Sequence, residues 1–307
     1  MNIIHAANEL SPRGRKVCVA IGMFDGVHLG HQQIIRQTIA DARRHDGIAL
    51  AITFDRHPNA VVAPQRVPDL IQPLQQKLRV IESLGTDALL LMHFDRAFSE
   101  QAGDAFVRKL VRDLGQIQSV CVGANFTFGH KRGGNVALLK KLGEKSKFTV
   151  HGMAAVSLDG RPVSSTRIRE AIRAGKLDAA SQMLGRAYSL TGRVVHGDGV
   201  GHKLGFPTAN LDVAGLAHPP NGVYAAHAQV GKEAYRAVLN IGHRPTLHRS
   251  TPKPTVEAHL LDFSGDLHGQ EIELIFLGRL RDEMKFASAA KLKEQIANDI
   301  AEARQQF

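Results

Sequence analysis

Two hydrophobic patterns divide the chain. Up to about residue 186, continuous apolar runs alternate with segments in which apolar residues recur every three or four positions. Such runs are typical of strands buried on both faces, and the three-to-four spacing is typical of helices. The runs are VCVAI, IALAITF, DALLLMHF and QSVCVG, and one further pair, NVALLKKLGEKS and FTVHGM, follows them. The alternation predicts a parallel sheet covered by helices on both faces.

Hydroxyl residues and glycines predict where individual helices begin and end. Ser99 is expected to cap the helix in SEQAGDAFVRKLVRDLG, which ends before Gly115. Ser164 or Ser165 is expected to cap the helix TRIREAIRAG, which stops at Gly175. Both segments therefore fit the helices of an alternating α/β fold.

The pattern changes after Gly185. Short strand-like runs follow one another with Gly, Pro or Asn between them, and no helical pattern intervenes. This arrangement predicts an antiparallel barrel or sandwich. A single closing helix is predicted by one apolar stripe, formed by Ala289, Leu292, Ile296 and Ile300. We expect two domains, residues 1–186 and residues 187–307.

The composition is that of a globular protein, with 43% apolar and 22% charged residues among 307. No apolar run approaches the roughly 20 residues of a membrane span, and the first residues lack the order of a secretion signal. Cys18 and Cys121 are the only cysteines, and each sits in an apolar, strand-like run. Buried free thiols are expected rather than a disulfide, which fits a cytoplasmic protein.

The net charge of +10 is placed unevenly. Residues 1–186 hold 26 Lys and Arg against 16 Asp and Glu, whereas residues 187–307 hold 13 of each. A basic domain indicates an anionic partner, although a solvated basic surface would look the same. Charge alone does not distinguish a nucleic acid from a nucleotide.

The first candidate site is GMFDGVHLGH, residues 22–31, between the first strand and the first helix. Ligands of parallel α/β sheets bind beyond the carboxyl ends of the strands. A helix N-terminus there offers N–H groups and partial positive charge to phosphate. Glycines let an anion approach the backbone, and His28 and His31 add two donors. The combination would stabilise charge that develops on a phosphorus under attack.

Other interpretations of this stretch are open. Two histidines three residues apart could hold a metal, but no third ligand stands nearby in the sequence. Both could instead be structural histidines of a tight turn. The glycine spacing is neither that of a Walker loop nor that of G-x-G-x-x-G.

Four stretches carry a resemblance to a known family. GMFDGVHLGH resembles the HxGH signature of the nucleotidyltransferase superfamily. The other three stretches are TFDRHP, VGANFTFGHKRGGN and VSSTRIREAIRAGKLDAASQMLGR. Together they resemble the FAD synthetase part of the prokaryotic bifunctional riboflavin kinase/FMN adenylyltransferases, and the resemblance runs from about residue 15 to 304. It implies a Rossmann-like nucleotidyltransferase domain followed by an antiparallel β-barrel riboflavin kinase domain with a C-terminal helix.

The resemblance implies roles for residues of the first domain. His28 and His31 would be catalytic, and FMN would attack ATP with its own phosphate, so little acid–base help is needed. ATP or phosphate binding would fall to Gly22, Phe24, Gly30, His57, Ser164, Ser165, Thr166 and Arg169. Flavin binding would fall to Phe54, Asn125, Phe126 and Phe128. At least one of the three phenylalanines is expected in the core instead, and His57 could equally be a plain loop residue.

The second candidate site is GHKLGFPTAN, residues 201–210. Glycine-rich backbone before a strand can wrap a phosphate. Thr208 and Asn210 fall on one face of an extended segment, and their oxygens suit Mg²⁺. Ordinary polar residues of a strand that begins near a proline are the alternative.

The resemblance extends to this second stretch, because GFPTAN is the riboflavin kinase signature. It implies that Glu257 is the base that activates a riboflavin hydroxyl, with Val256 and Ala258 facing the other side of the strand. A surface glutamate is the alternative. ATP binding would involve Gly201, Lys203, Gly205 and Pro207, and Mg²⁺ would be held by Thr208 and Asn210. Arg281 and Phe286 would help to close the flavin site.

The resemblance predicts ATP as co-substrate with riboflavin, FMN and FAD as partners, without nucleic acid or membrane; weak self-association is left open. An enzyme with only one of the two activities, or a flavin-binding regulator, remains the alternative. Residues that depart from the family pattern are Met23, Thr127, His202, Leu247 and His268. The His202 change is expected to weaken phosphate binding, and the others could alter flavin affinity.

Overall fold

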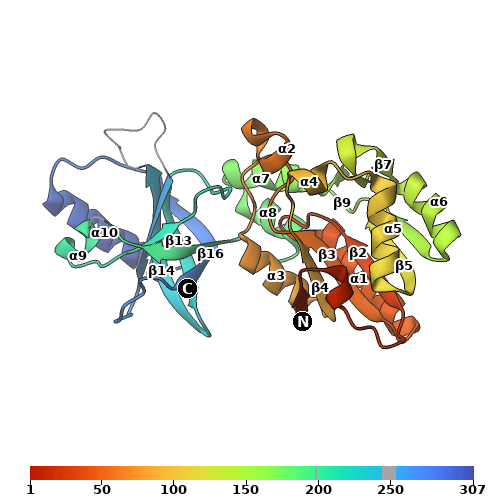
Figure 1. The fold of residues 1–307 in the computed structure, drawn as a ribbon. Coiled ribbons are helices and arrows are strands. Elements are labelled where there is room, and N and C mark those ends of the chain that lie inside the picture. The colour runs from red at the N-terminus through yellow and green to blue at the C-terminus, as the bar shows by residue number, and fades with distance from the viewer. Residues whose placement is uncertain (198, 244–253) are drawn as a thin grey trace. The chain divides into compact units, whose positions relative to one another are not determined.

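The computed structural model describes residues 1–197, 199–243 and 254–307 (Figure 1). Leu247, one of the departures from the family pattern, lies outside the described residues. The chain forms two compact units, which we call the N-terminal unit (1–68 and 74–165) and the C-terminal unit (69–73 and 166–307). Among the described residues, no helix combines the length and apolar character that crossing a membrane requires.

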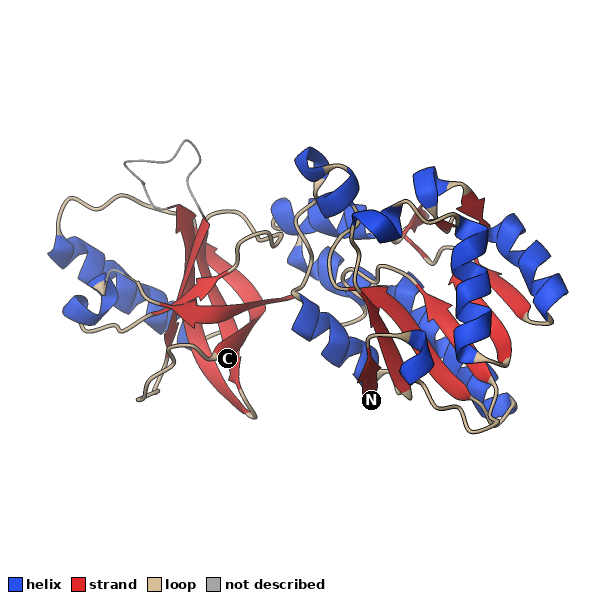
Figure 2. Ribbon diagram, viewed as in Figure 1, coloured by secondary structure: helices blue, strands red, loops and turns tan. Residues whose placement is uncertain are grey.

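The N-terminal unit is built on a six-stranded sheet in which every pair of neighbours is parallel (Figure 2). The strand order is β1-β4-β3-β2-β5-β8. The strands are β1 (Asn2–Ile4), β2 (Val17–Ile21), β3 (Ile48–Phe54), β4 (Ala88–Met92), β5 (Ile117–Gly123) and β8 (Thr149–Met153). The expected parallel sheet is thus confirmed, whereas β1 was not predicted, because three residues are too few to show a pattern.

Helices cover both faces of this sheet. They are α1 (Leu29–Arg44), α3 (Leu74–Ser83), α5 (Gly103–Leu114) and α6 (Val136–Ser146). Successive strand residues point to opposite faces. Val17 and Val19 of β2 accordingly join the core formed with α5 and α6, and Cys18 and Ala20 join the core formed with α1 and α3. Both cysteines are buried and free, as expected.

The strand order places a topological switch beside β2. From β2 the chain moves through β3 to β4 in one direction, and β5 then pairs with the other side of β2. Loops that leave the carboxyl ends of β2 and β5 diverge at such a point, which leaves room for a ligand between them. The fold therefore predicts a binding site where residues 22–31 meet the segment after Gly123.

One expected helix is interrupted. Ser99 was predicted to cap it, but the structure has a short helix, α4 (Arg96–Ser99), whose cap is Asp95, with its side chain accepting from Phe98 N at 2.7 Å. The carbonyl of Gln101 accepts from His130 N at 2.8 Å, so this carbonyl does not take part in a helical hydrogen bond. The main helix α5 begins only after this contact, and it ends at Gly115 as predicted.

Short elements complete the N-terminal unit and lead into the C-terminal unit. The strand pairs are β6 (Thr127–Phe128) with β7 (Gly134–Asn135), and β9 (Ser157–Leu158) with β10 (Arg161–Pro162). The helices are α2 (Asn59–Val62), α7 (Ser165–Arg173) and α8 (Leu177–Leu184), with 3₁₀ turns at Ala7–Glu9, Pro64–Arg66 and His130–Arg132. The helix predicted near Ser165 is thus present.

The C-terminal unit contains a closed antiparallel barrel (Figure 2). Its order is β11-β12-β15-β14-β13-β16. The strands are β11 (Ser189–Val195), β12 (Ala209–Asp212), β13 (Gly222–Val230), β14 (Glu233–His243), β15 (Pro254–Leu260) and β16 (Glu271–Arg281). The glycine-rich segment, where no helix was expected, forms α9 (Val200–Leu204), which starts after Gly199 and ends at Gly205, both in the left-handed conformation.

The division into units does not coincide with the expected boundary at residue 186. Residues 69–73 belong with the C-terminal unit because Arg173 pairs with Asp69 at 2.6 Å and Arg186 donates to Gln72 at 2.7 Å. Leu70 also forms a backbone bridge with Leu216. Where the two activities divide along the chain stays a prediction.

The last helix, α10 (Ala289–Arg304), is tied to the barrel by a buried ion pair. Arg281 at the end of β16 contacts both carboxylate oxygens of Asp299, at 2.8 and 2.7 Å. The Asp299 side chain is only 4% exposed. Removing one partner of such a pair leaves the other charge buried without compensation.

We expect Asp299→Ala to lower the free energy of unfolding of the barrel by about 3 kcal/mol. The matched control is Asp262→Ala: Asp262 also pairs with α10, through Arg304, but it is 59% exposed, so the loss of stability should be much smaller. Urea unfolding followed by circular dichroism measures both. Equal costs for the two variants would contradict the assignment of the buried pair.

Candidate functional site

The chain leaves β2 through a tight turn with unusual backbone geometry. Phe24 and Val27 have positive φ angles of 51° and 39°, and both side chains are fully buried. Non-glycine residues adopt this conformation at a cost, which the surrounding structure must offset. A side chain at Gly22 would lie 2.6 Å from the Phe24 ring, so the ring can cover the backbone there only because residue 22 is a glycine.

Three polar side chains hold this turn. Thr53 at the end of β3 donates to the carbonyl of Met23 at 3.1 Å. Gln32 of α1 donates from its amide to the carbonyl of Val27 at 2.9 Å. The ammonium of Lys77, on α3, donates to Phe54 O at 2.8 Å, to Thr53 Oγ1 at 3.2 Å and to Met23 O at 3.4 Å. The ends of β2 and β3 are thus fixed to one buried cation.

The two histidines lie at the start of α1, as the sequence predicted. His28 is the N-cap, and its Nδ1 accepts from His31 N at 3.4 Å. The two rings stack with centroids 3.6 Å apart. Because Nδ1 of His28 accepts, neutral His28 carries its proton on Nε2, which is therefore a donor. Gly30 lies below the His28 ring, where an added Cβ would come within 3.3 Å.

His31 is held neutral. Its burial, together with the nearby His28 and Lys77, lowers the pKa of His31 well below the usual range. Its Nδ1 atom is buried and has no hydrogen-bond partner within the described residues. A neutral imidazole can donate through one nitrogen without the desolvation cost of a buried cation.

A cavity of about 260 Å³ opens at the switch point. Residues from the end of β2 line one side, and residues that follow β5 line the other. Of the predicted site residues it contains Gly22, Phe24, His28, Gly30, His31, Asn125 and Phe126. Seven residues from two separate motifs thus meet where the strand order reverses.

Three other predicted residues of this unit, all among the described residues, are not part of the lining of that cavity. Phe54 packs on Phe94 and Phe98, with ring centroids 5.6 and 5.8 Å away. Phe128 stacks on Phe126 at 5.4 Å and packs against the core. His57 accepts the backbone N–H of Asn59 at 3.1 Å and so orders the start of α2.

At the serine-rich start of α7, one predicted residue contacts the turn after β2. Ser165, the first residue of α7, donates to the carbonyl of Asp25 at 3.0 Å. Ser164 precedes the helix and Thr166 is exposed on it. Arg169 is 8% exposed, and its Nε donates to the carbonyl of Asp69 at 2.6 Å. The phosphate-binding roles of these four residues stay predictions.

The structure adds Lys77 to the residues that build the candidate site, and the sequence did not predict it. Lys77 occupies a position on α3 where the helical pattern calls for a buried residue, next to Leu78 and Ile81. Burial lowers the pKa of Lys77 to about 8, although the carboxylates of Asp25 and Asp55 act in the opposite direction. The sequence signal for Lys77 was a lysine on the buried stripe of a helix. Its partners lie in other segments, so the sequence of α3 does not predict them.

The barrel brings Thr208, Asn210 and Glu257 close together. Asn210 of β12 is the direct cross-strand partner of Glu257 on β15, and Asn240 of β14 is its partner on the other side. Side chains of direct partners lie on one face about 5 Å apart. Val256 and Ala258 are buried, so they face the other side of β15, as predicted. A carboxylate therefore stands between two amides on the face that also carries Thr208.

A cavity of about 490 Å³ borders Thr208 and Asn210, whereas Glu257 is not among its lining residues and β15 contributes Ala258 and Leu260 instead. It is lined by Pro207, Thr208 and Asn210, and by His202 and His268, two of the departures from the family pattern. A side chain at Gly201 would lie 3.1 Å from Thr208 Oγ1, so a glycine there lets the segment fold back on the strand. Lys203 and Gly205, on and after α9, are exposed and do not border this cavity as described.

The two predicted flavin contacts near the last helix are also close to each other. The guanidinium of Arg281 lies over the Phe286 ring, 5.7 Å from its centroid. The same guanidinium is held by Asp299. Arg281 is therefore fixed in place, and a role in flavin binding stays a prediction.

Comparisons with known proteins match each part of the chain to a family. Residues 11–167 match the family model described as FAD synthetase, and residues 184–307 match the one described as riboflavin kinase. A bifunctional riboflavin kinase/FMN adenylyltransferase of Escherichia coli is 34% identical over 100% of this chain and 98% of its own length. Proteins of the same description from Haemophilus influenzae and Bacillus subtilis are 34% and 35% identical over 99% and 100% of this chain, and over 97% and 98% of their own lengths.

A solved structure described as a macrolide-efflux protein of Streptococcus pneumoniae has the same fold. Its TM-score is 0.83 at 27% identity, with 98% of each chain covered. The matched models define a two-part transferase, with the nucleotidyltransferase part first and the kinase part second. The chain belongs to the bifunctional riboflavin kinase/FMN adenylyltransferase family. The resemblance seen in the sequence motifs is thus confirmed.

We expect the buried Lys77 to make stability depend on pH. Between the folded-state pKa of about 8 and the unfolded value of 10.5, the unfolded chain binds more protons, so stability rises with pH in this window. Relative to Lys77→Met, the free energy of unfolding of the wild-type protein should therefore rise by up to about 3 kcal/mol from pH 8 to pH 10.5. Urea unfolding at several pH values measures the difference.

Lys109→Met is the matched control, since the Lys109 side chain on α5 is 58% exposed. Its difference from the wild type should stay flat across the same window. A flat difference for Lys77→Met as well would show that the ammonium is not buried.

Proposed function

We propose that the N-terminal unit transfers the adenylyl group of ATP to FMN and that the barrel phosphorylates riboflavin with ATP. The observation that carries the first half is the cavity at the switch point, where His28, His31 and Asn125 meet. The observation that carries the second half is the register that sets Glu257 beside Asn210. Riboflavin, FMN, ATP and FAD are then the ligands of one chain.

In the adenylyl transfer, an FMN phosphate oxygen attacks the α-phosphorus of ATP. A bond to the α-phosphorus forms, the bond to the β-phosphate oxygen breaks, and pyrophosphate leaves. The attacking group is already an anion, so the residues need to orient the phosphates and stabilise charge. Nε2–H of His28, a donor from neutral His31 and the N-terminus of α1 would supply that stabilisation.

Flavin and ATP recognition follow from the lining of the same cavity. Phe126 offers a partly exposed aromatic face there, and Asn125 offers amide hydrogen-bonding groups. Gly22 lets the Phe24 ring cover the backbone and Gly30 lets the His28 ring lie close above it, so both glycines shape the turn beside which a phosphate would bind. His57 and Ser164 remain candidates for the outer phosphates of ATP, with Ser165 tied to the turn, and the phosphate-binding roles of Thr166 and Arg169 stay predictions.

In the kinase reaction, Glu257 would accept the proton of the attacking riboflavin hydroxyl. The oxygen then bonds to the γ-phosphorus of ATP, and ADP leaves. Pro207 and the glycine-rich segment around Gly201, Lys203 and Gly205 would approach the ATP phosphates. Arg281 and Phe286 would bound the flavin.

Mg²⁺ fits the donors of the barrel site. Thr208 and Asn210 are half-buried, alternate with the buried Ala209, and supply two hard oxygen atoms to one cavity. Mg²⁺ is usually held by few protein oxygens together with water and substrate phosphates. When bound there, the ion would neutralise charge on the ATP phosphates.

The free buried thiols Cys18 and Cys121 favour a reducing cytoplasm as the location.

Two substitutions should separate the two reactions. His28→Ala should lower FAD formation from FMN by about 10²-fold or more, because a phosphate donor is lost, and leave FMN formation from riboflavin unchanged. Glu257→Gln should lower FMN formation by about 10²-fold or more and leave FAD formation from added FMN unchanged. Chromatography of flavins after incubation with ATP and Mg²⁺ measures both products.

The matched controls are Gln33→Ala on the second turn of α1 and Thr255→Ala on β15, and neither residue lines one of the two cavities. Equal loss of both activities in His28→Ala would contradict the division of labour. A wild-type protein that forms FMN but never FAD would support the one-activity alternative instead.

Substitution of the oxygen donors should change the Mg²⁺ requirement of one reaction only. Asn210→Ala should raise the Mg²⁺ concentration for half-maximal riboflavin phosphorylation by about tenfold, because one ligand is lost. The requirement of FAD formation should not move. Calorimetric titration of Mg²⁺ in the presence of a non-hydrolysable ATP analogue gives a readout apart from turnover, and an unchanged isotherm would exclude Asn210 as a ligand.

A further inference from the structure

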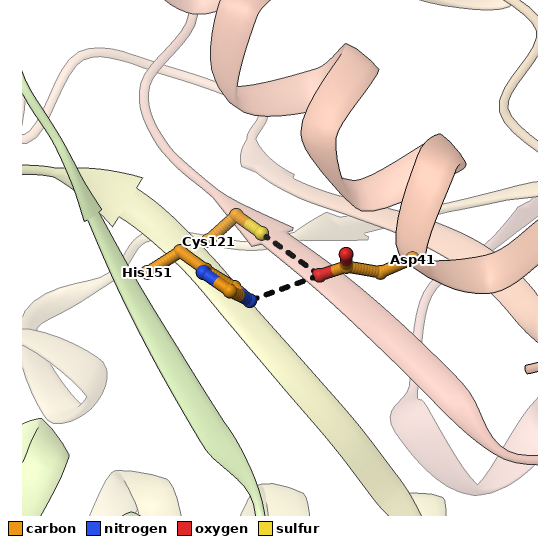
Figure 3. Close-up of side chains that lie close together, drawn as sticks. All are labelled: Asp41, Cys121 and His151. Atoms are coloured by element: carbon orange, nitrogen blue, oxygen red, sulfur yellow. Dashed lines mark hydrogen bonds and ion pairs between the residues drawn. The ribbon is translucent and has the colours of Figure 1, made fainter. Parts of the chain in front are cut away.

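Three side chains converge in the N-terminal unit, away from the residues that line the switch-point cavity (Figure 3). Asp41 comes from α1, Cys121 from β5 and His151 from β8. His151 Nε2 lies 3.1 Å from Asp41 Oδ2, and Cys121 Sγ lies 3.9 Å from the same oxygen. Each residue offers one ligand atom, and the three atoms lie within 4.8 Å of one another.

The fold brings these residues together by strand register. Cys121 and His151 are direct partners on neighbouring parallel strands, so their side chains point to the same face of the sheet. That face is covered by α1, whose residues Ile34, Ile35 and Ile39 pack in the same core as Cys121. Asp41 follows on the last turns of the helix, with its side chain 3% exposed. A sheet face under a helix is ordinarily apolar, and a buried carboxylate there needs compensation.

The two oxygens of Asp41 have different partners. Oδ1 accepts from the amide of Gln37 at 2.8 Å and lies 3.4 Å from the guanidinium of Arg44, both on α1. Oδ2 faces the thiol and the imidazole. Neighbours on its own helix therefore orient the carboxylate, as the outer hydrogen bonds of metal ligands do.

The distances lie within about 0.3 Å of those expected around a tetrahedral cation. With zinc–ligand bonds of about 2.0 to 2.3 Å, ligand atoms of a tetrahedral site lie about 3.3 to 3.6 Å apart. The two distances of 3.1 and 3.9 Å fall on either side of this range. The His151 side chain is 34% exposed, which leaves a route for a cation and room for water.

We propose that Asp41 Oδ2, Cys121 Sγ and His151 Nε2 bind one divalent cation of the zinc class, with water as the fourth ligand. A sulfur, a nitrogen and a single carboxylate oxygen favour zinc over Mg²⁺ or Ca²⁺, which prefer oxygen ligands. On binding, the thiol releases its proton to solvent as the sulfur–metal bond forms, and the cation replaces the hydrogen bond between Asp41 and His151. The ion fastens the end of α1 to β5 and β8.

Cobalt(II) titration of the chelator-treated full chain tests the proposal, because thiolate ligands give cobalt a charge-transfer band in the near ultraviolet. The wild-type protein should bind one Co²⁺ with this band, and Zn²⁺ should displace it. Cys121→Ser should remove the band, and His151→Ala should weaken binding by about tenfold or more. His151→Ala changes a partly exposed side chain, so it keeps the test valid where Asp41→Asn fails to fold.

Cys18→Ser is the matched control, since Cys18 is the other buried thiol and lies on the neighbouring strand β2. It should keep both the band and the affinity. A wild-type protein without a charge-transfer band, or a band that survives Cys121→Ser, would overturn the proposal and leave the three residues as a hydrogen-bonded cluster. Loss of the band in Cys18→Ser alone would equally overturn the assigned ligands.

Discussion

The structure of the proposed adenylylating site depends on one buried cation. Lys77 is 4% exposed, and its ammonium bonds to the backbone of the turn after β2 and of the end of β3. Those ends carry the turn in which Phe24 and Val27 hold a costly backbone conformation. Lys77 on α3 and Gln32 on α1 both donate to carbonyls of this turn. They therefore fix the position of the stacked histidines at the start of α1. The same cation helps to keep His31 neutral.

The two sites solve different chemical problems. In the proposed adenylyl transfer FMN brings its own charged nucleophile, so the α/β unit needs donors and a helix N-terminus, and its histidines would serve without acting as a strong base. Riboflavin brings an alcohol, so the barrel needs a carboxylate. The register of β12, β15 and β14 places Glu257 between Asn210 and Asn240, and strand pairing alone fixes that row.

Local patterns predicted most of the fold and the position of the histidine pair in it. The apolar runs identified β2, β3, β4, β5 and β8, and the HxGH string placed the histidines at the start of α1. What failed depended on contacts distant in sequence. Ser99 lost its capping role because Gln101 bonds with His130 in another loop. The partners of Lys77, and the cluster around Asp41, become visible only when segments far apart in the chain are set side by side. The roles of Arg169 and Arg281 stay predictions, because each already has a partner inside the protein.

The central claim is that the histidine pair at the switch point contacts the phosphates of ATP. Nitrogen-15 spectra of the histidine rings, recorded at neutral pH during titration with a non-hydrolysable ATP analogue, test it most directly. The account predicts a saturable shift of the protonated Nε2 of His28, assigned by its absence from His28→Ala, with His31 neutral throughout. An Nε2 resonance that does not move while the analogue binds the N-terminal unit would contradict the account.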